Sequence, residues 1–389
     1  MKKYDCIIVG GGMVGASCAL TLAQLGLRIA LVDKVKPKVF QAEQPFDLRV
    51  SAISLASEYL LESINAWNSI KAMRSSPYRR LGVWENEHAY TEFNSNDINQ
   101  QHLGHIVENR IIQLALWQQI ANQSNIELFC PESVINIDQT NNEVEVTLET
   151  KKLNAKILIA ADGANSQIRQ QAGIGTTGWD YQQAAMLINV ETQLGQQEIT
   201  WQQFRPTGPV AMLPLQGNHA SLVWYHSKSE INRLSSLTNA QLCNDVNQFF
   251  PEKLGGIKQV FAKGAFALTR KHANQYLQGK IILIGDAAHS INPLAGQGVN
   301  LGFKDVLALK NVIATAIGTG QCWYSESVLS QYEKLRRNDN LLMMTTMDAF
   351  YGVFSHSSSI VKSIRNTGLS LINKSSLIKN KALAYACGI

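Results

Sequence analysis

The residues best placed for chemistry lie in a glycine-rich turn near the amino terminus. The turn follows an apolar run and has the spacing GxGxxG, and the residues expected to contact a ligand are Gly10, Gly12, Met13, Val14 and Gly15. The first glycine permits a tight bend, the second lets the backbone approach a pyrophosphate, and the third lets a helix lie close to the strand. A helix that begins here points free N–H groups at phosphates. The turn therefore predicts a dinucleotide site, for either NAD or FAD.

Three acids stand where apolar runs end. Asp33 closes the second run, where a carboxylate can bind a ribose hydroxyl. Asp162 begins the pattern DGxxSxxR, which ends at Arg169, although Asp-Gly is also a common turn pair and Asp162 could serve only as a turn former. Asp286 follows Gly285 after a third apolar run and can accept hydrogen bonds from two hydroxyls of a ribityl or ribose chain. Three strand ends are thus predicted to contribute to one site.

The stretch after Asp286 is rich in glycine and leads into a predicted helix. Gly296 and Gly298 let backbone N–H groups approach a flat ring. The positive end of the helix that begins near Gly298 favours negative charge on a reduced flavin. His289 lies in the same stretch and either takes part in catalysis or caps the turn.

The elements that position these residues alternate between two patterns. Residues 5–33 and the later strands and helices have the pattern of a Rossmann-like α/β fold, whereas 184–266 have the period of two that is typical of an antiparallel sheet, interrupted by a helix at 239–250. We therefore predict an α/β protein with two interleaved domains. The predicted segments are 1–75, 100–175 and 275–340 for the nucleotide-binding domain, 76–99 and 176–274 for the substrate domain, and 341–389 for a C-terminal helical layer.

The composition narrows the class of protein. A hydrophobic content of 45% with 17% charged residues indicates a globular chain, and a net charge of +5 without a basic-aromatic block excludes nucleic acid as the expected partner. The six cysteines are scattered without a CxxC pair, which predicts no metal site and a reducing compartment. Because Asp5 and the glycines interrupt the first apolar run, we expect no signal peptide, and no window is apolar enough to span a bilayer. These features predict a cytoplasmic protein.

The C-terminal segment has a charge asymmetry. After Asp348 the chain contains no acid, and its charged residues are all basic: Lys362, Arg365, Lys374, Lys379 and Lys381. Apolar residues recur among them at roughly helical spacing. The segment is either a helical layer packed on the body or a face for anionic lipid or a partner.

Together, the motifs GxGxxG, DGxxSxxR and GD, in this order, resemble the flavin-dependent aromatic hydroxylases. The resemblance covers essentially the whole chain and is greatest to the ubiquinone-biosynthesis hydroxylases. The strings that carry it are residues 47–54 (DLRVSAIS), 73–81 (MRSSPYRRL), 103–109 (LGHIVEN), 200–215 (TWQQFRPTGPVAMLPL) and 285–306 (GDAAHSINPLAGQGVNLGFKDV). It implies an FAD-binding domain of the aromatic hydroxylase and glutathione reductase type.

The resemblance also implies roles for individual residues. Beyond the glycine turn, the implied FAD-binding residues are Asp33, Arg49, Asn109, Val134, Asp162, Arg169, Gly285, Asp286, Gly298, Val299 and Asn300. Asp33 stands where the family more often has Glu, and Asn109 where many relatives have Arg or Gln. No catalytic acid or base is identified; the residues implied to lie beside the flavin are His289, Pro293, Gly296 and Gln297.

The reaction implied is hydroxylation of the ring of a prenylated benzoquinol in ubiquinone biosynthesis, with FAD, O2, and NAD(P)H or another transient electron donor. An oxygen-substituted ring is already activated, so no strong protein base is needed. Four residues are expected either to line the ring-binding cavity or to pack in the core: Trp201, Phe204, Met212 and Trp224. The alternatives are hydroxylation of another ring carbon, a flavin-dependent prenyl-lipid reductase, and a non-catalytic FAD-bound subunit. The expected partners are other ubiquinone-biosynthesis proteins or the inner face of a membrane.

Overall fold

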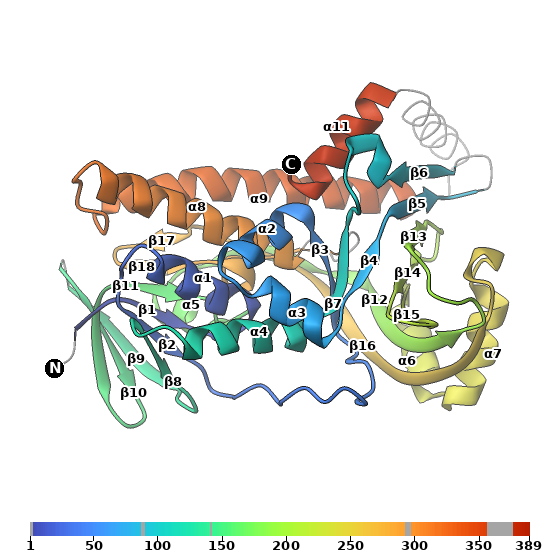
Figure 1. The fold of residues 1–389 in the computed structure, drawn as a ribbon, viewed down its shortest axis with the longest axis horizontal. Helices are drawn as coiled ribbons and strands as arrows, with labels where there is room; N and C mark the ends of the chain where they lie inside the picture. The colour runs from blue at the N-terminus through green and yellow to red at the C-terminus, as the bar shows by residue number, and fades with distance from the viewer. Residues whose placement is uncertain (1–2, 87–89, 141, 292–295, 297, 356–375) are drawn as a thin grey trace.

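Two large sheets make up the body of the protein (Figure 1). The computed structural model describes residues 3–86, 90–140, 142–291, 296, 298–355 and 376–389. The first sheet has the order β17-β18-β11-β1-β2-β8, with β10 beside β11 and β9 beside β10. Its strands are β1 (Lys3–Val9), β2 (Ile29–Val32), β8 (Ile126–Phe129), β9 (Val134–Gln139), β10 (Val144–Leu148), β11 (Lys152–Ala160), β17 (Leu277–Gln278) and β18 (Ile281–Leu283).

The centre of the first sheet is parallel and buried on both faces. β1 pairs in parallel with β2 and β11, and β11 pairs in parallel with β18. These strands are almost continuously apolar, as expected for strands buried on both faces. The helices near this sheet are α1 (Met13–Ala23), α4 (Asn109–Ala121), α5 (Gln167–Gln171) and α8 (Gly298–Gly318). This arrangement places the carboxyl ends of β1, β2, β11 and β18 at one edge.

The second sheet is antiparallel apart from one pair and has the order β19-β16-β12-β15-β14-β13-β5-β6. Its strands are β5 (Arg80–Trp84), β6 (Thr91–Asn94), β12 (Thr176–Thr192), β13 (Ile199–Gln203), β14 (Val210–Pro214), β15 (His219–Ser227), β16 (Ile257–Ala273) and β19 (His289–Ser290). Two helices, α6 (Lys228–Ser236) and α7 (Asn239–Phe249), pack against it. The predicted α/β fold with an antiparallel second sheet is confirmed, and the exact domain boundaries stay a prediction.

A small third sheet connects the body to the C-terminal helices. It has the order β3-β7-β4 and consists of β3 (Val50–Ser54), β7 (Gly104–Glu108) and β4 (Ser76–Tyr78). Near it lie α2 (Leu55–Ser63), α3 (Trp67–Met73) and the short helix η2 (Ser95–Ile98). Two further short helices are η3 (Glu252–Leu254) and η4 (Gly285–Ala287).

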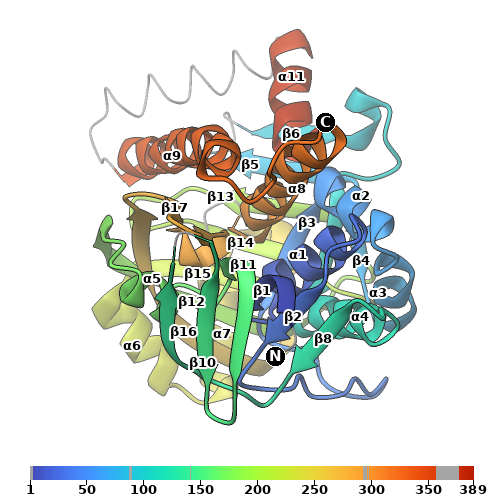
Figure 2. The ribbon, with the colours of Figure 1, turned by 90° about the vertical axis from the view of Figure 1, so that its left-hand side faces the viewer.

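Long C-terminal helices form a layer over the body. α9 (Glu326–Ser355) runs beside α8 along the length of the molecule, and α11 (Ser376–Cys387) stands near η2 (Figures 1 and 2). Leu383 and Cys387 pack with Leu55 and Leu103 in a small buried cluster. Within the described ranges, none of the helices combines the length and the apolar character that a membrane crossing requires.

Candidate cofactor site

The glycine turn between β1 and α1 is tightly packed on one side and open on the other. Gly10 has a φ of 104°, and a Cβ there would overlap the carbonyl oxygen of Ala161 at the end of β11. A Cβ at Gly15 would overlap the carbonyl oxygen of Gly10, so only glycine lets α1 lie this close to β1. A Cβ at Gly12, by contrast, would have no described atom within 4 Å. Gly12 is also the N-cap of α1. Because glycine has no side chain to cap the helix, the N–H groups at the helix N-terminus can receive an anion.

Side chains from neighbouring elements hold the peptide of Gly11 from both sides. Asp33, which directly follows β2, accepts hydrogen bonds from the N–H groups of Gly11 and Val35. The Gly11 carbonyl accepts hydrogen bonds from Trp117 Nε1 at 2.7 Å and Gln113 Nε2 at 2.8 Å, both on α4. Sequence reasoning missed these two residues, since nothing in the local pattern of α4 indicates that its polar side chains reach this turn.

Asp162 and Arg169 belong to the second motif, DGxxSxxR, and connect it to the third motif, GD, at Gly285 and Asp286. Asp162 Oδ2 accepts hydrogen bonds from the N–H groups of Gln167 and Ile168, whereas its Oδ1 is buried without a hydrogen-bond partner among the described residues. Arg169 is buried and donates to the carbonyl oxygen of Ala287 at 2.8 Å. Asp162 therefore does form a turn, and it also keeps one acceptor available for a ligand.

Asp286 lies where Arg49 and the third motif meet. The residue is exposed to solvent, although the surrounding protein partly desolvates its carboxylate. This desolvation raises the pKa of Asp286, and the nearby charges of His289 and Arg49 partly oppose the rise. Gly285 has a φ of 59° at the turn before it. The N–H of Asn109 donates to the Arg49 carbonyl at 3.0 Å. The structure thus brings Arg49, Asn109 and Asp286 into one region, as the FAD assignment requires.

His289 lies beneath the third motif in a buried charged network. Its Nε2 lies 2.6 Å from Asp305 Oδ2, which also accepts the N–H of Gly285 at 3.0 Å. Arg336 Nε donates to the other Asp305 oxygen at 2.7 Å. Although burial opposes ionisation of Asp305, the charges and hydrogen bonds of His289 and Arg336 prevail and lower its pKa. His289 is 2% exposed, so this geometry supports the structural alternative over direct catalysis.

The start of α8 offers backbone rather than side chains to a ligand. Gly296 has a φ of 61°, and a Cβ at Gly298 would have no described atom within 4 Å. The Asn300 side chain is fully engaged: Oδ1 accepts from Ser57 Oγ at 2.7 Å and from the Ser54 N–H, and Nδ2 donates to the Ala52 carbonyl at 2.8 Å. Asn300 therefore anchors α8 to β3 and α2. Val299 is half-buried, and Pro293 and Gln297 lie outside the described residues.

Val134 lies near the ribose end of the predicted site. It is the first residue of β9 and is buried. Two residues earlier, the N–H of Glu132 donates to the Asp33 carbonyl at 3.0 Å. The backbone at Val134 is thereby placed close to the acid predicted to bind the adenosine ribose.

The four residues considered for substrate binding lie mostly in a core away from these motifs. Trp201, Met212 and Trp224 pack between the second sheet and helices α6 and α7, and Trp224 stacks on Phe249 at 4.5 Å between ring centroids. Phe204 is buried just after β13. The structure therefore supports the core-packing alternative and does not bring these rings to the flavin motifs.

The opposite face of the second sheet is the one directed at the cofactor motifs. Asn189 on β12 donates from Nδ2 to the carbonyl oxygens of Phe46 and Asp47, three and two residues before Arg49. On the same face a small buried cluster includes Tyr181, Ala185, Tyr225 and Leu268. Sequence reasoning missed these residues, although alternation along β15 places Tyr225 opposite to Trp224 and so could have identified them.

Comparison with known proteins agrees with this geometry. The family model described as "FAD binding domain" matches residues 3–344. The chain is 44% identical to the 3-demethoxyubiquinol 3-hydroxylase of Escherichia coli, over 100% of this chain and 99% of that protein. It is 31% identical to the ubiquinone hydroxylase UbiL of Rhodospirillum rubrum (100% and 90% covered) and 31% identical to the rat mitochondrial ubiquinone biosynthesis monooxygenase COQ6 (98% and 90%).

Solved structures show the same fold. The crystal structure of p-nitrophenol 4-monooxygenase PnpA from Pseudomonas putida matches with a TM-score of 0.79 at 18% identity, covering 98% of this chain and 97% of that one. PqsL, a probable FAD-dependent monooxygenase from Pseudomonas aeruginosa, also matches with a TM-score of 0.79, at 17% identity, covering 95% and 99%. The resemblance stated from the motifs is confirmed: the protein belongs to the FAD binding domain family, as a flavin-dependent aromatic-ring monooxygenase related to the ubiquinone-biosynthesis hydroxylases.

Proposed function

We propose that the protein is an FAD-dependent monooxygenase that hydroxylates the ring of a prenylated benzoquinol in ubiquinone biosynthesis, at the position used by 3-demethoxyubiquinol 3-hydroxylase. The observation that carries this proposal is the 44% identity to that Escherichia coli enzyme over both full lengths. The cofactor motifs support it, because all three converge on one edge of the first sheet. A prenylated quinol is accordingly the proposed substrate.

The chain's own residues have distinct proposed roles around FAD. Backbone N–H groups at Gly12 and the start of α1 bind the phosphates, Asp33 binds the adenosine ribose, and Asp286 binds the ribityl hydroxyls. The unpartnered Oδ1 of Asp162 accepts a further hydrogen bond from the cofactor or the electron donor. The backbone around Gly296 and Gly298 surrounds the ring. Reduced FAD supplies the activation of O2, and the protein supplies position and exclusion of water.

A cavity of about 300 Å³ beside β12 supports a substrate position. Its lining includes Phe46, Arg74, Asn189, His219 and Phe261. Asn189 is buried and its Oδ1 has no hydrogen-bond partner among the described residues, so it can accept a hydrogen bond from a phenolic hydroxyl. We expect Asn189→Leu to raise KM for the quinol more than it lowers kcat. An unchanged KM would place the substrate elsewhere.

The reaction is tested with the FAD-loaded protein, NADH as donor, the quinol substrate and ¹⁸O2. Mass spectrometry should find one ¹⁸O atom in the product and no product without oxygen. Product formed without oxygen would instead support a prenyl-lipid reductase. If Asp286→Ala lost FAD while ubiquinone synthesis in cells continued, the protein would be a non-catalytic subunit.

The alternative is hydroxylation of a different ring carbon, because the chain is also 31% identical to the ubiquinone hydroxylase UbiL and the ubiquinone biosynthesis monooxygenase COQ6, whose names specify no ring position. Cells lacking the protein should accumulate the quinol intermediate that it normally consumes. An intermediate that lacks the oxygen at ring carbon 3 supports the main assignment. An intermediate missing a different ring oxygen would assign another carbon while leaving the fold and cofactor unchanged.

We also propose a cytoplasmic location with contact to the inner face of the membrane or to other ubiquinone-biosynthesis proteins. Large apolar side chains are exposed on or just after the last helices, including Leu335, Leu342, Tyr385 and Ile389. Lys381 is exposed among them. Vesicles containing anionic phospholipid should sediment the protein in low salt, whereas neutral vesicles should sediment it less. Equal binding to both would argue against a charge-dependent contact.

A further inference from the structure

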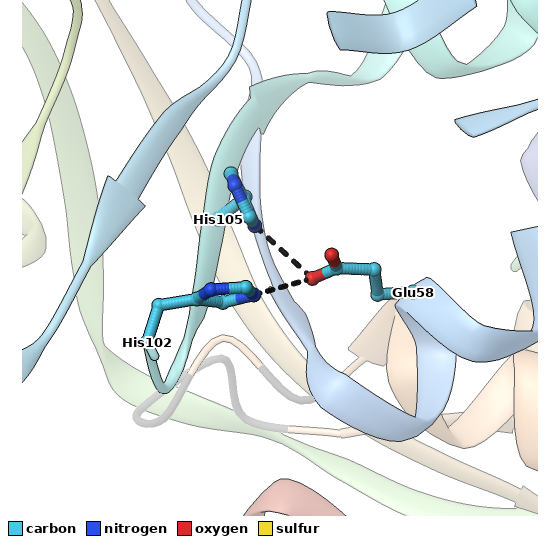
Figure 3. Close-up of side chains that lie close together, drawn as sticks. All are labelled: Glu58, His102 and His105. Carbon is cyan, nitrogen blue, oxygen red and sulfur yellow. Dashed lines mark hydrogen bonds and ion pairs between the residues drawn. The ribbon is translucent and has the colours of Figure 1, made fainter. Parts of the chain in front are cut away.

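Two histidines and a glutamate, none of them used by the proposed reaction, meet between α2 and the start of β7 (Figure 3). His102 Nε2 lies 2.9 Å from Glu58 Oε2, and His105 Nδ1 lies 3.1 Å from the same oxygen. All three ligand atoms lie within 4.8 Å of one another. From these contacts we infer that Glu58, His102 and His105 form a binding site for a divalent transition-metal ion of the Zn²⁺ class, separate from the flavin site.

The distances suit such an ion. A tetrahedral Zn²⁺ with Zn–N and Zn–O bonds of about 2.0–2.1 Å separates its ligand atoms by about 3.3 Å. The two contacts to Glu58 therefore need to lengthen by only a few tenths of an ångström, and the two imidazole nitrogens, which lie within 4.8 Å of each other, need to reach the same separation. Three protein ligands leave the fourth position for water. Imidazole nitrogens favour Zn²⁺, Co²⁺ or Fe²⁺ over Mg²⁺ and Ca²⁺, which prefer oxygen ligands.

The three side chains differ in how far they are exposed to solvent. Glu58 and His105 are buried, while the His102 side chain is 21% exposed. An ion can therefore enter from the His102 side. Without a metal ion, the two imidazole nitrogens hydrogen-bond to Glu58. To bind an ion, each of these nitrogens must lose its proton and present a lone pair, so protons compete with the metal for the site.

The site would join two elements that support the flavin loop. Glu58 lies on α2, one residue after Ser57, whose hydroxyl donates to Asn300 at the start of α8. His105 lies on β7, which pairs with β3 directly before α2. A bound ion would fix α2 against β7 and thereby the anchor of α8. Because the ion binds only the folded site, it should raise the Tm of the protein.

The test uses full-length, FAD-loaded protein treated with a chelator and then titrated with Zn²⁺ in a calorimeter. We expect one ion bound with a micromolar or lower Kd, together with a higher Tm. Co²⁺ should give visible d–d absorption without a thiolate charge-transfer band, which separates this site from adventitious binding at cysteine. Because the Trp67 ring lies 4.9 Å from the His105 ring, Co²⁺ should also quench its fluorescence.

His102→Ala is the informative variant, because it removes a half-buried ligand and leaves the buried Glu58–His105 contact in place. Replacing a second-sphere partner usually costs a site 10–100-fold in affinity, so losing a ligand should cost about 100-fold or more. His226→Ala, which changes a histidine on the second sheet, is the matched control and should bind like the wild type. His102→Cys should restore binding and add the charge-transfer band with Co²⁺. No saturable binding by the wild type, or equal binding by His102→Ala and His226→Ala, would overturn the proposal.

Discussion

Asp286 combines an unfavourable charge in the free protein with a predicted role in binding FAD. Its pKa is raised by desolvation, so the folded protein loses stability as the pH rises through that pKa. We therefore predict that Asp286→Asn raises the Tm of the FAD-free protein at pH 7. The same change should weaken FAD binding about tenfold or more, since a hydrogen bond to a charged acceptor contributes about 1.5–3 kcal/mol.

Flavin fluorescence titration and thermal unfolding at pH 7 measure both effects. Asp180→Asn, an exposed acid on the second sheet, is the matched control and should change neither quantity. A variant that keeps full FAD affinity would remove Asp286 from the cofactor site.

Asp305 makes the opposite contribution to stability. Its pKa in the folded protein lies below the ordinary 3.8, so the ionised carboxylate stabilises the fold above that pH and this contribution is lost as the pH falls. Asp305→Asn should destabilise the protein at pH 7 by about 3–5 kcal/mol, because His289 and Arg336 lose the buried carboxylate that they share. Urea unfolding at a series of pH values should show that the variant loses less stability than the wild type below about pH 4. Parallel curves would mean that Asp305 does not carry this acid sensitivity.

At the scale of the element, the strand–turn–helix unit separates two kinds of glycine. Gly15→Ala should destabilise the FAD-free protein by about 1–3 kcal/mol or more, because its Cβ overlaps the Gly10 carbonyl. At Gly12 an added Cβ would have open space and φ is −69°, so Gly12→Ala should cost little stability. It should nonetheless reduce FAD affinity strongly, because the new methyl group lies in the predicted path of the pyrophosphate. Urea unfolding and FAD titration of the pair check this, and equal stability of the two variants would contradict it.

The same unit shows what could be predicted from sequence. Gly10, Gly15 and Asp33 act within one local strand–turn–helix–strand segment, so their spacing alone encodes the geometry. The role of Trp201 and Trp224 was harder to predict, because alternation along a strand identifies a buried face without showing whether a helix or a ligand covers it. Asp305 could be suspected as an acid on the apolar side of a helix, but its partners are 16 and 31 residues away. Glu58 and His102, 44 residues apart, meet only through the third sheet.

At the scale of the whole molecule, the C-terminal helix closes over residues from the first third of the chain. Cys387 is buried, its Sγ lies 3.7 Å from the Leu103 carbonyl, and burial raises its pKa to about 11. Its thiol should therefore react only when α11 leaves the body. We predict that Leu383→Ala, which removes about 2–5 kcal/mol of packing, speeds labelling of Cys387 by a thiol reagent more than tenfold.

Peptide mass spectrometry after timed labelling measures this rate. The exposed Cys322 serves as the internal reference and should label quickly in both proteins. If Cys387 labels at the same rate in both, α11 does not open independently of the rest of the fold.

The parallel sheet is completed late in the order of synthesis. β1 pairs with β11, and β11 pairs with β18, whose first residue is Ile281. At about 5–20 residues per second, the ribosome needs roughly 15–55 s to proceed from the end of β1 to β18. During that interval β1 and β2, joined later by β11, exist without β18 and without α8. The newborn chain therefore exposes a strand edge capable of aggregation, and a chaperone that binds apolar strands would increase the yield of folded protein.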